Sequence, residues 1–153
     1  MKSMTRMLVV LCVAALLATA GCASSGKKPK PEELVMQQTQ SLVADLLAGK
    51  ADTILNYVSE DFYHPDVDGG KAKLAEYIEQ GKQMGYVDQF PDLVKEHNAK
   101  VVLDNAKVTV NKETASVYPI EASANEGSVT VELQYKKDKD GIWRVSGANI
   151  EGI

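Results

Sequence analysis

Cysteine and histidine are scarce in this chain, which has two of each among 153 residues. Both cysteines, Cys12 and Cys22, lie near the N-terminus. A domain formed by the rest of the chain therefore has no thiol for catalysis, a disulfide or a metal site. A phosphate-binding glycine loop, a zinc-ligand spacing and a nucleophile motif are also absent. These absences exclude the commonest sequence signatures of catalysis.

Basic side chains are outnumbered by acidic ones, 17 to 21. Removal of residues 1–21 would leave 15 basic and 21 acidic side chains, a net charge of −6. Nucleic-acid binding needs clustered lysine and arginine to displace counterions from phosphates, and adhesion to anionic lipid needs a basic patch. The composition argues against both kinds of partner.

The N-terminal segment has the layout of a secretory signal and contains no acidic residue. Lys2 and Arg6 precede an apolar run from Met7 to Leu17, and small residues then end directly before Cys22. This order predicts a bacterial lipoprotein signal over residues 1–21. The alternative is an uncleaved anchor, but the apolar run is shorter than the ~20 residues that a transmembrane helix needs.

We expect Cys22 to begin the mature protein and to carry a lipid that binds the membrane. Each buried methylene contributes about 0.8 kcal/mol, so several acyl chains make release negligible. Residues 22–31 contain lysine, proline, serine and glycine without hydrophobic periodicity, which predicts a flexible tether. Ala23 and Ser24 after the cysteine resemble lipoproteins passed on to the outer membrane. We therefore expect a cell-envelope location, on the periplasmic side of the outer membrane where the host has one.

Residues 32–153 are enough for one domain with a single core. Apolar residues recur at helical spacing after Pro31, and Glu32 and Glu33 suit a first helical turn, so a helix is predicted from Pro31 to Ala48. Leu74, Tyr77 and Ile78 are expected to be buried by a later helix. Asp52 is expected to cap a second, shorter helix that runs through Val58. A third helix is predicted to follow a loop from Tyr63 to Gly70 and to run to about Gln83, and Pro91–His97 to add one or two turns.

From Lys100 onward the hydrophobic period changes to two, which predicts a series of strands. Asp140 and Gly141 predict a tight turn before the last strand. That strand is expected to place Trp143 and Val145 on one face, with Ile142 and Ile150 on the other. Helices followed by antiparallel strands predict an α+β domain.

Three local phrases carry a resemblance to a known family: Gly49–Asp52 after the first helix, Tyr57–Phe62 leading to Gly70, and Gly141–Val145 near the end. With the order of elements, they make residues 32–151 similar to the nuclear transport factor 2-like superfamily, which includes SnoaL-like polyketide cyclases and ketosteroid isomerases. The resemblance implies a cone-shaped, cystatin-like α+β roll. In such a roll, N-terminal helices pack on a curved antiparallel sheet around an interior pocket.

The resemblance also suggests a site. His64 precedes Pro65 where ketosteroid isomerases have their general base, and an imidazole can exchange protons near neutral pH. Asp66 would then orient the imidazole, and Tyr57 or Tyr118 would donate a hydrogen bond. The isomerases use a carboxylate base, so this chain departs from their pattern. The alternative is that His64 and Pro65 only shape a surface loop.

No metal ion or other cofactor is predicted. His64, Asp66 and Asp68 lack a fourth ligand and the full calcium-loop spacing, and Asp68 also suits the cap of the following helix. Asp138 and Asp140 flank the expected hairpin turn, which explains them without a metal.

Tyrosines are numerous beside only two phenylalanines and one tryptophan. A phenol combines a large apolar face with one hydrogen bond, which suits the lining of an apolar pocket. The alternative is that tyrosines such as Tyr77 and Tyr135 pack in the core. The ligand-binding candidates are Tyr57, Tyr63, His64, Asp66 and Tyr118.

Three functions remain open from the sequence. The first is an envelope lipoprotein whose non-catalytic domain binds a small apolar ligand or an envelope protein; it is favoured because no complete catalytic set is visible. The second is an isomerase, dehydratase or cyclase acting on a small hydrophobic substrate through His64. The third is a structural module that forms a homodimer through the outer face of its sheet.

Overall fold

The structure, a computed structural model, describes residues 28–65 and 69–152, so Cys22, Asp66 and Asp68 lie outside the described residues. Within those ranges no helix is long and apolar enough to cross a membrane. The helices are α2 (Pro31–Leu47), α3 (Ala51–Ile54), the 3-10 turn η1 (Leu55–Tyr57), α4 (Gly70–Gln83) and α5 (Tyr86–Glu96). The strands are β1 (Val58–Tyr63), β2 (Lys100–Val102), β3 (Lys107–Asn111), β4 (Thr114–Ala124), β5 (Gly127–Lys137) and β6 (Trp143–Glu151).

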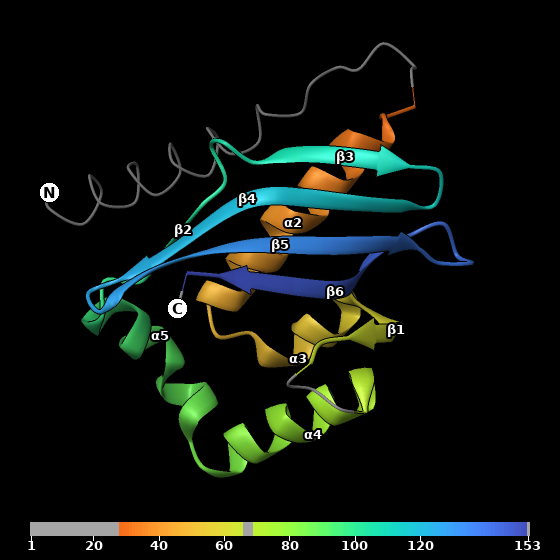
Figure 1. The fold of residues 1–153 in the computed structure, drawn as a ribbon. Coiled ribbons are helices and arrows are strands. Elements are labelled where there is room, and N and C mark those ends of the chain that lie inside the picture. The colour runs from red at the N-terminus through yellow and green to blue at the C-terminus, as the bar shows by residue number, and fades with distance from the viewer. Residues whose placement is uncertain (1–27, 66–68, 153) are drawn as a thin grey trace, which may run out of the picture.

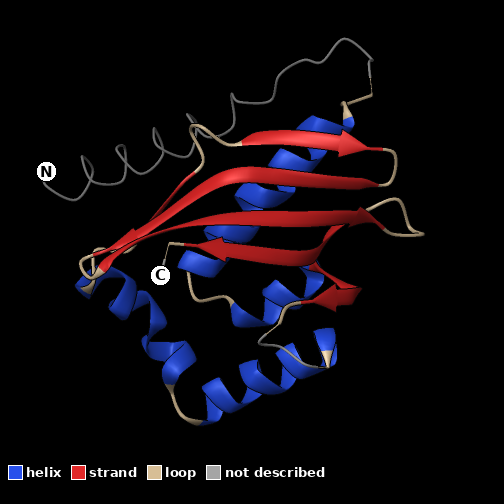
Figure 2. Cartoon of the chain, viewed as in Figure 1, coloured by secondary structure: helices blue, strands red, loops and turns tan. Residues whose placement is uncertain are grey.

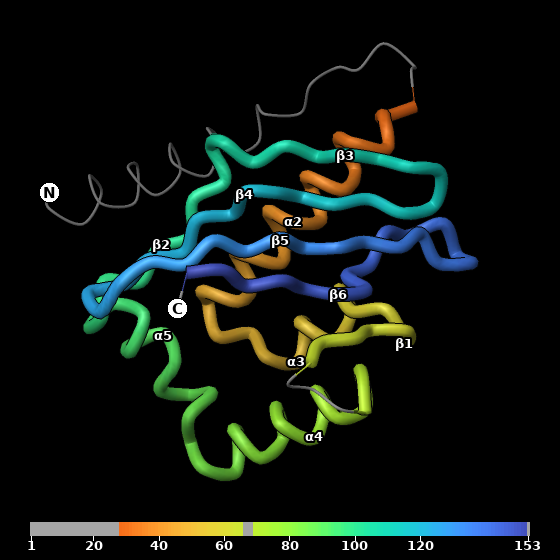
Figure 3. Tube along the Cα trace, viewed as in Figure 1, coloured from red at the N-terminus to blue at the C-terminus, as the bar shows by residue number. Residues whose placement is uncertain are grey.

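The six strands form one curled sheet in the order β1-β6-β5-β4-β2, with β3 also paired to β4. Helix α2 crosses behind the strands, while α3, α4 and α5 lie beyond the β1 side of the sheet (Figures 1 and 2). Among the described elements no helix covers the opposite face, which we call the outer face (Figure 3). The predicted α+β class is confirmed.

Helix α2 begins as its sequence predicts. Pro31 occupies the first turn, where a missing N–H costs no hydrogen bond, and the Glu33 carboxylate accepts a hydrogen bond from the backbone N–H of Lys30 at 3.2 Å. The helix ends at Leu47, and Gly49 follows with φ +68°. Its buried residues, Val35 and Thr39, face the sheet and anchor the core.

The core lies between α2 and the inner face of strands β3 to β6. Its buried members come from one helix and three strands: Val35, Ala115, Val117, Ile120, Tyr135, Trp143 and Val145. Directly opposed residues share a face of a sheet, so the pairing of Ala115 with Tyr135 and of Tyr135 with Val145 explains their joint burial. By contrast, α4 and α5 contain no buried residue.

One strand was not predicted. Residues Val58–Tyr63 form β1, which pairs in parallel with β6, so the sheet is mixed and not wholly antiparallel. The segment lacks a clean period of two, and its first residues continue the apolar spacing of the preceding helix. The helix expected up to Val58 accordingly ends early, as α3 and η1, and the residue before α3 is Lys50, not the Asp52 expected from the sequence.

Two expectations about burial are wrong. Tyr77 is 45% exposed because α4 packs beside β1 and not on the core. Ile150 lies opposite Val131, which lies opposite buried Ile120, so it shares the inner face with Trp143. A register shift in β6 near Val145 causes this, because one extra residue reverses the side-chain alternation.

Helix α5 is longer than predicted. It begins at Tyr86 after Gly85 and contains Pro91 in its interior, where the sequence had suggested a start. Gly85 has φ +76°, so it ends α4 and turns the chain into α5. Helices α4 and α5 therefore follow one another with a sharp turn between them (Figure 1).

Candidate functional site

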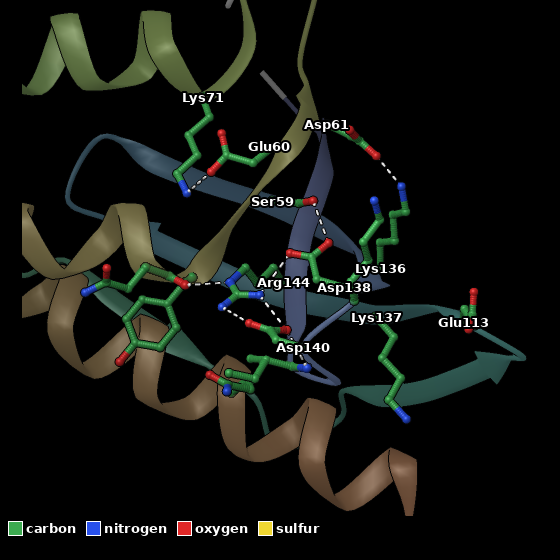
Figure 4. A pocket seen from close by; sticks show the side chains of 15 residues that line it. Ser59, Glu60, Asp61, Lys71, Glu113, Lys136, Lys137, Asp138, Asp140 and Arg144 are labelled. Atoms are coloured by element: carbon green, nitrogen blue, oxygen red, sulfur yellow. Dashed lines mark hydrogen bonds and ion pairs between the residues drawn. The ribbon is translucent and has the colours of Figure 1, made fainter.

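A polar groove of about 1120 Å³ lies at the end of the sheet, beside β1 and the β5–β6 turn (Figure 4). Its charged lining is balanced between five carboxylates and five cations, namely Glu60, Asp61, Glu113, Asp138, Asp140, Lys71, Lys136, Lys137, Lys139 and Arg144. Such a groove could bind a charged ligand only if its charges were available. Most of them are already engaged with one another.

Arg144 is the centre of this network. Its Nη1 donates to Asp138 Oδ2 at 2.9 Å, its Nη2 donates to Asp140 Oδ2 at 2.7 Å, and its Nε donates to the Asn56 carbonyl at 3.3 Å. The guanidinium holds the pKa of Asp140 at about 2, helped by the Ile142 backbone N–H. Arg144 therefore fastens the β5–β6 turn to the segment before β1.

The neighbouring charged side chains also form pairs with one another. Lys71 pairs with Glu60 at 2.7 Å, and Lys136 pairs with Asp61. The Ser59 hydroxyl donates to Asp138 Oδ1 at 3.1 Å. The groove is thus a cross-linked polar wall, and within residues 28–65 and 69–152 no group of histidine, cysteine and carboxylate side chains is placed to hold a metal.

The candidate residues from the sequence lie in different parts of the fold. Tyr57 lines the polar groove, and its hydroxyl donates to Asp45 Oδ2 at 2.7 Å. That bond raises the pKa of Tyr57, and bonds from Lys50 and Tyr57 lower the pKa of Asp45. Tyr57 therefore joins η1 to α2.

Tyr63 and Tyr118 both lie on the outer face. Tyr63 is opposite Gly147, which is opposite Gln134, and Tyr63 is 69% exposed. Tyr118 is on β4, 44% exposed, and two strands separate β4 from β1. His64 directly follows β1 and is half-buried. His64 is next to Tyr63 in the chain, but the structure does not bring it near Tyr118. Asp66 lies outside the described residues.

A second hollow is apolar and was missed from the sequence. It has two adjoining parts that share Leu46 and Phe90, and we call it the apolar cleft. The part against the sheet has about 590 Å³ and the part against α4 about 270 Å³. The first is walled by Leu47, Val94, Val101, Ala122 and Val129, and the second by Ala51, Ile54, Leu74, Ile78, Tyr86 and Val87.

The apolar cleft lies where α5 and the sheet meet the C-terminal end of α2. Leu46 remains 43% exposed there, although it is on the apolar side of α2. The signal in the sequence was the spacing of Tyr86, Phe90 and Val94, which is helical and apolar. A helix that starts at Pro91 leaves Tyr86 and Phe90 outside it, so the interpretation of Pro91 as a helix start missed that pattern.

No protein-family model matches the chain, and no curated protein sequence matches it. Solved structures do. A candidate ketosteroid isomerase from Parabacteroides distasonis aligns with a TM-score of 0.58 and 12% identity, over 85% of this chain and 93% of that one. A protein from Novosphingobium aromaticivorans, described as nuclear transport factor 2-like with a cystatin-like fold, aligns with a TM-score of 0.52 and 16% identity, over 77% and 79%. The domain has the nuclear transport factor 2-like fold.

Similar structures with this fold differ in what they are named for. The hub of the CaMKII protein from S. rosetta aligns over 83% of this chain and 100% of its own length, with a TM-score of 0.55 and 17% identity. Bd1075 from Bdellovibrio bacteriovorus aligns with a TM-score of 0.51 and 9% identity, and this chain covers only 39% of it. A shared fold does not fix a shared activity.

Within the nuclear transport factor 2-like fold of this chain, the buried core fills the N-terminal half of α2, around Val35 and Thr39. Among the described residues, the apolar cleft lies at the other end of α2, by Leu46 and Leu47. The cleft is the hollow best suited to an apolar ligand.

Proposed function

We propose that this protein is an envelope lipoprotein anchored through a lipid on Cys22, whose nuclear transport factor 2-like domain binds a small apolar ligand without transforming it. The anchor places it in the cell envelope, on the periplasmic side of the outer membrane where the host has one. The apolar cleft is the observation that carries the binding function.

The size and lining of the cleft support this proposal. Small-molecule sites commonly have ~300–1,000 Å³ and mostly apolar walls, and the larger part of the cleft has about 590 Å³. Its wall is built mainly from aliphatic side chains and Phe90. Lys100, Ser123 and Ser128 also line it, and the carboxylate of Glu126 is paired with His97. The ligand that fits such walls is apolar and uncharged.

The arrangement of the polar residues supports a role without chemistry. A general base needs a donor that stabilises the developing oxyanion. The Tyr57 proton is donated to Asp45, and Tyr118 is on the outer face, two strands from His64. Neither phenol lines the apolar cleft, and His64 does not line it either.

Binding is tested with the mature chain made as a Cys22→Ser variant, which keeps every residue from Ala23 onward but carries no lipid. Native mass spectrometry reports molecules retained through purification, and N-phenyl-1-naphthylamine serves as a fluorescent apolar probe. Leu46 and Ile142 form a matched pair, because each is 43% exposed and only Leu46 lines the cleft. Leu46→Gln should weaken probe binding about tenfold, since one buried apolar side chain contributes about 1.5 kcal/mol or more.

Ile142→Gln should bind the probe as the parent does. If the parent binds neither a retained molecule nor the probe, the ligand-binding proposal is wrong. Equal weakening by the two substitutions would place the probe elsewhere and would also contradict it.

A homodimer is the second candidate, favoured by the outer face. That face is uncovered among the described elements and presents Tyr63 and Tyr118, which are 69% and 44% exposed. Sedimentation of the mature chain tests this: a dimer that Tyr118→Glu dissociates supports it, and a strict monomer contradicts it.

An isomerase is the third candidate, favoured by the position of His64 directly after β1 and by the alignment with a candidate ketosteroid isomerase. It requires that His64→Ala lower turnover of a steroid-like ketone by ~10² or more. Full turnover by that variant would remove His64 from the role.

A further inference from the structure

Helix α5 is divided into two halves by Pro91. Proline has no backbone N–H, so the carbonyl of Val87 has no partner from the next turn, and the helix is weakened there. A Cβ on Gly49 would lie 2.9 Å from Pro91 Cγ, which shows how closely the middle of α5 sits on the chain after α2. The middle of the helix is thus seated on the chain after α2.

The second half of α5 forms a wall of the apolar cleft. Phe90, at the joint, lines both parts of the cleft, and Val94, one turn further, lines the larger part against the sheet. Leu93 is 38% exposed, and α5 has no buried residue. Elements with few buried apolar contacts open locally at low free energy.

Three contacts hold this half of α5 to the turn between β4 and β5. The Asn125 backbone N–H donates to the His97 carbonyl at 2.9 Å, and Asn125 Nδ2 donates to the Glu96 carbonyl at 3.2 Å. His97 Nδ1 contacts Glu126 Oε1, and Glu126 also lines the cleft. Asn98, just beyond, has φ +49°, which marks a second bend in the chain.

We infer that residues 92–97 are a flap that pivots at Pro91 and Asn98 to admit ligand to the apolar cleft, and that Asn125 and Glu126 hold it closed. The role of the flap in admitting ligand rests on the proposed function, whereas the position and attachments of the flap come from the structure alone. Pro91 interrupts the helical hydrogen bonds at one end of the flap, and Asn98 has a positive φ at the other. Apart from backbone bonds within α5 and to residues 98 and 99, its polar attachments among the described residues are the three contacts to the β4–β5 turn.

Protonation supports the closed position. The Glu126 carboxylate raises the pKa of His97, and Glu96 on the same helix acts in the same direction. The cation on the cleft wall, Lys100, is on the strand that follows the flap. Because the pKa of His97 is raised on closing, the pair contributes fully below the ordinary pKa of histidine and is lost as pH rises through the raised value.

The test uses the Asn125→Ala/Glu126→Gln variant of the mature Cys22→Ser chain. Hydrogen exchange read by mass spectrometry needs no ligand: the amides of residues 93–97 should exchange about fivefold faster, while those of α4 stay unchanged. Stopped-flow association of N-phenyl-1-naphthylamine should also be about fivefold faster. The matched control is Glu76→Gln, which breaks the exposed Lys73 pair on α4 at 2.6 Å and should change neither readout.

Raising the pH from 6 to 9 should speed probe association in the parent and not in the double variant. Unchanged exchange at 93–97 would overturn the flap whether or not the probe binds. Faster exchange with unchanged association would overturn the flap as the route into the cleft. A parent that binds no probe would instead overturn the proposed function, while the exchange result still decides whether the flap opens.

Discussion

The buried hydrogen bond between Tyr135 and Thr39 offers the sharpest test of how the core is held together. The Thr39 hydroxyl donates its one proton to the Val35 carbonyl at 2.9 Å, so the Tyr135 hydroxyl, 2.8 Å from Thr39 Oγ1, is the donor of the second bond. Tyr135 is 2% exposed and Thr39 is fully buried. This bond joins α2 to the centre of the sheet.

The two partners should respond unequally to removal. Tyr135→Phe deletes the donor and leaves Thr39 still bonded to Val35, so it should cost about 1 kcal/mol. Thr39→Val leaves the Tyr135 hydroxyl buried without an acceptor and should cost about 2–3 kcal/mol. The double variant should be more stable than Thr39→Val alone, because the orphaned hydroxyl is gone.

Alkaline pH adds a second, independent signature. Burial raises the pKa of Tyr135 to about 12 from an ordinary value near 10. The folded state thus favours the neutral phenol, so stability is complete below pH ~10 and falls as pH rises toward 12, by about 3 kcal/mol in all. Tyr135→Phe has no ionisable hydroxyl at this position, so its stability does not fall in this way. The variant should therefore equal the parent near pH ~11 and exceed it above that.

Urea unfolding followed by the fluorescence of Trp143, the single tryptophan and 3% exposed, measures all four proteins. The other tyrosines titrate alike in parent and variant, so they cancel in the difference. Additive losses in the double variant would refute the hydrogen bond as the coupling between Tyr135 and Thr39. A constant difference between Tyr135→Phe and the parent from pH 7 to 11.5 would refute the role of burial.

Two further outcomes follow from the structure, and a third tests the proposed lipid anchor. Gly49→Ala should destabilise by about 2 kcal/mol or more in urea unfolding, because φ is +68° and Pro91 is in the way, whereas Gly81→Ala inside α4, with Val87 at 3.4 Å, should stabilise by up to about 1 kcal/mol. Arg144→Ala should raise the pKa of Asp140 from about 2 toward its ordinary value in an NMR titration; an unchanged pKa would contradict the pairing. Cys22→Ser should release the protein from the membrane fraction and abolish the lipid mass of its N-terminal peptide.

The elements with a strong period were predictable, and those fixed by tertiary contacts were not. The helix from Pro31 and the strands β4 and β5 have clear spacing and proper ends, and the structure confirms them. Strand β1 becomes a strand because the edge of β6 pairs with it, and no local pattern in VSEDFY encodes that pairing. The face of Ile150 was wrong for a similar reason, since the register shift near Val145 is a property of two strands together.

The candidate site was harder to predict than the fold. Sequence proximity groups Tyr57, Tyr63 and His64, but the turn from η1 into β1 sends Tyr57 toward α2 and Tyr63 to the outer face. The sequence predicts tyrosines as the lining of an apolar pocket. The cleft is instead walled mainly by aliphatic side chains from α2, α5 and the sheet. Which aliphatic side chains stay uncovered depends on how the helices meet, and spacing along one element does not contain that information.

The position of the cleft also bears on how an anchored protein would use it. Helix α2 has 17 residues, a length of about 25 Å, and the cleft is at its C-terminal end, by Leu46 and Leu47. The proposed lipid on Cys22 is joined to the other end of α2 by residues 22–30, which can span at most about 30 Å. Because the anchor and the cleft are at opposite ends of α2, the cleft can face away from the anchoring membrane. A ligand would then reach the cleft through the surrounding water. In that position a closed flap would shield the apolar walls of the cleft from water.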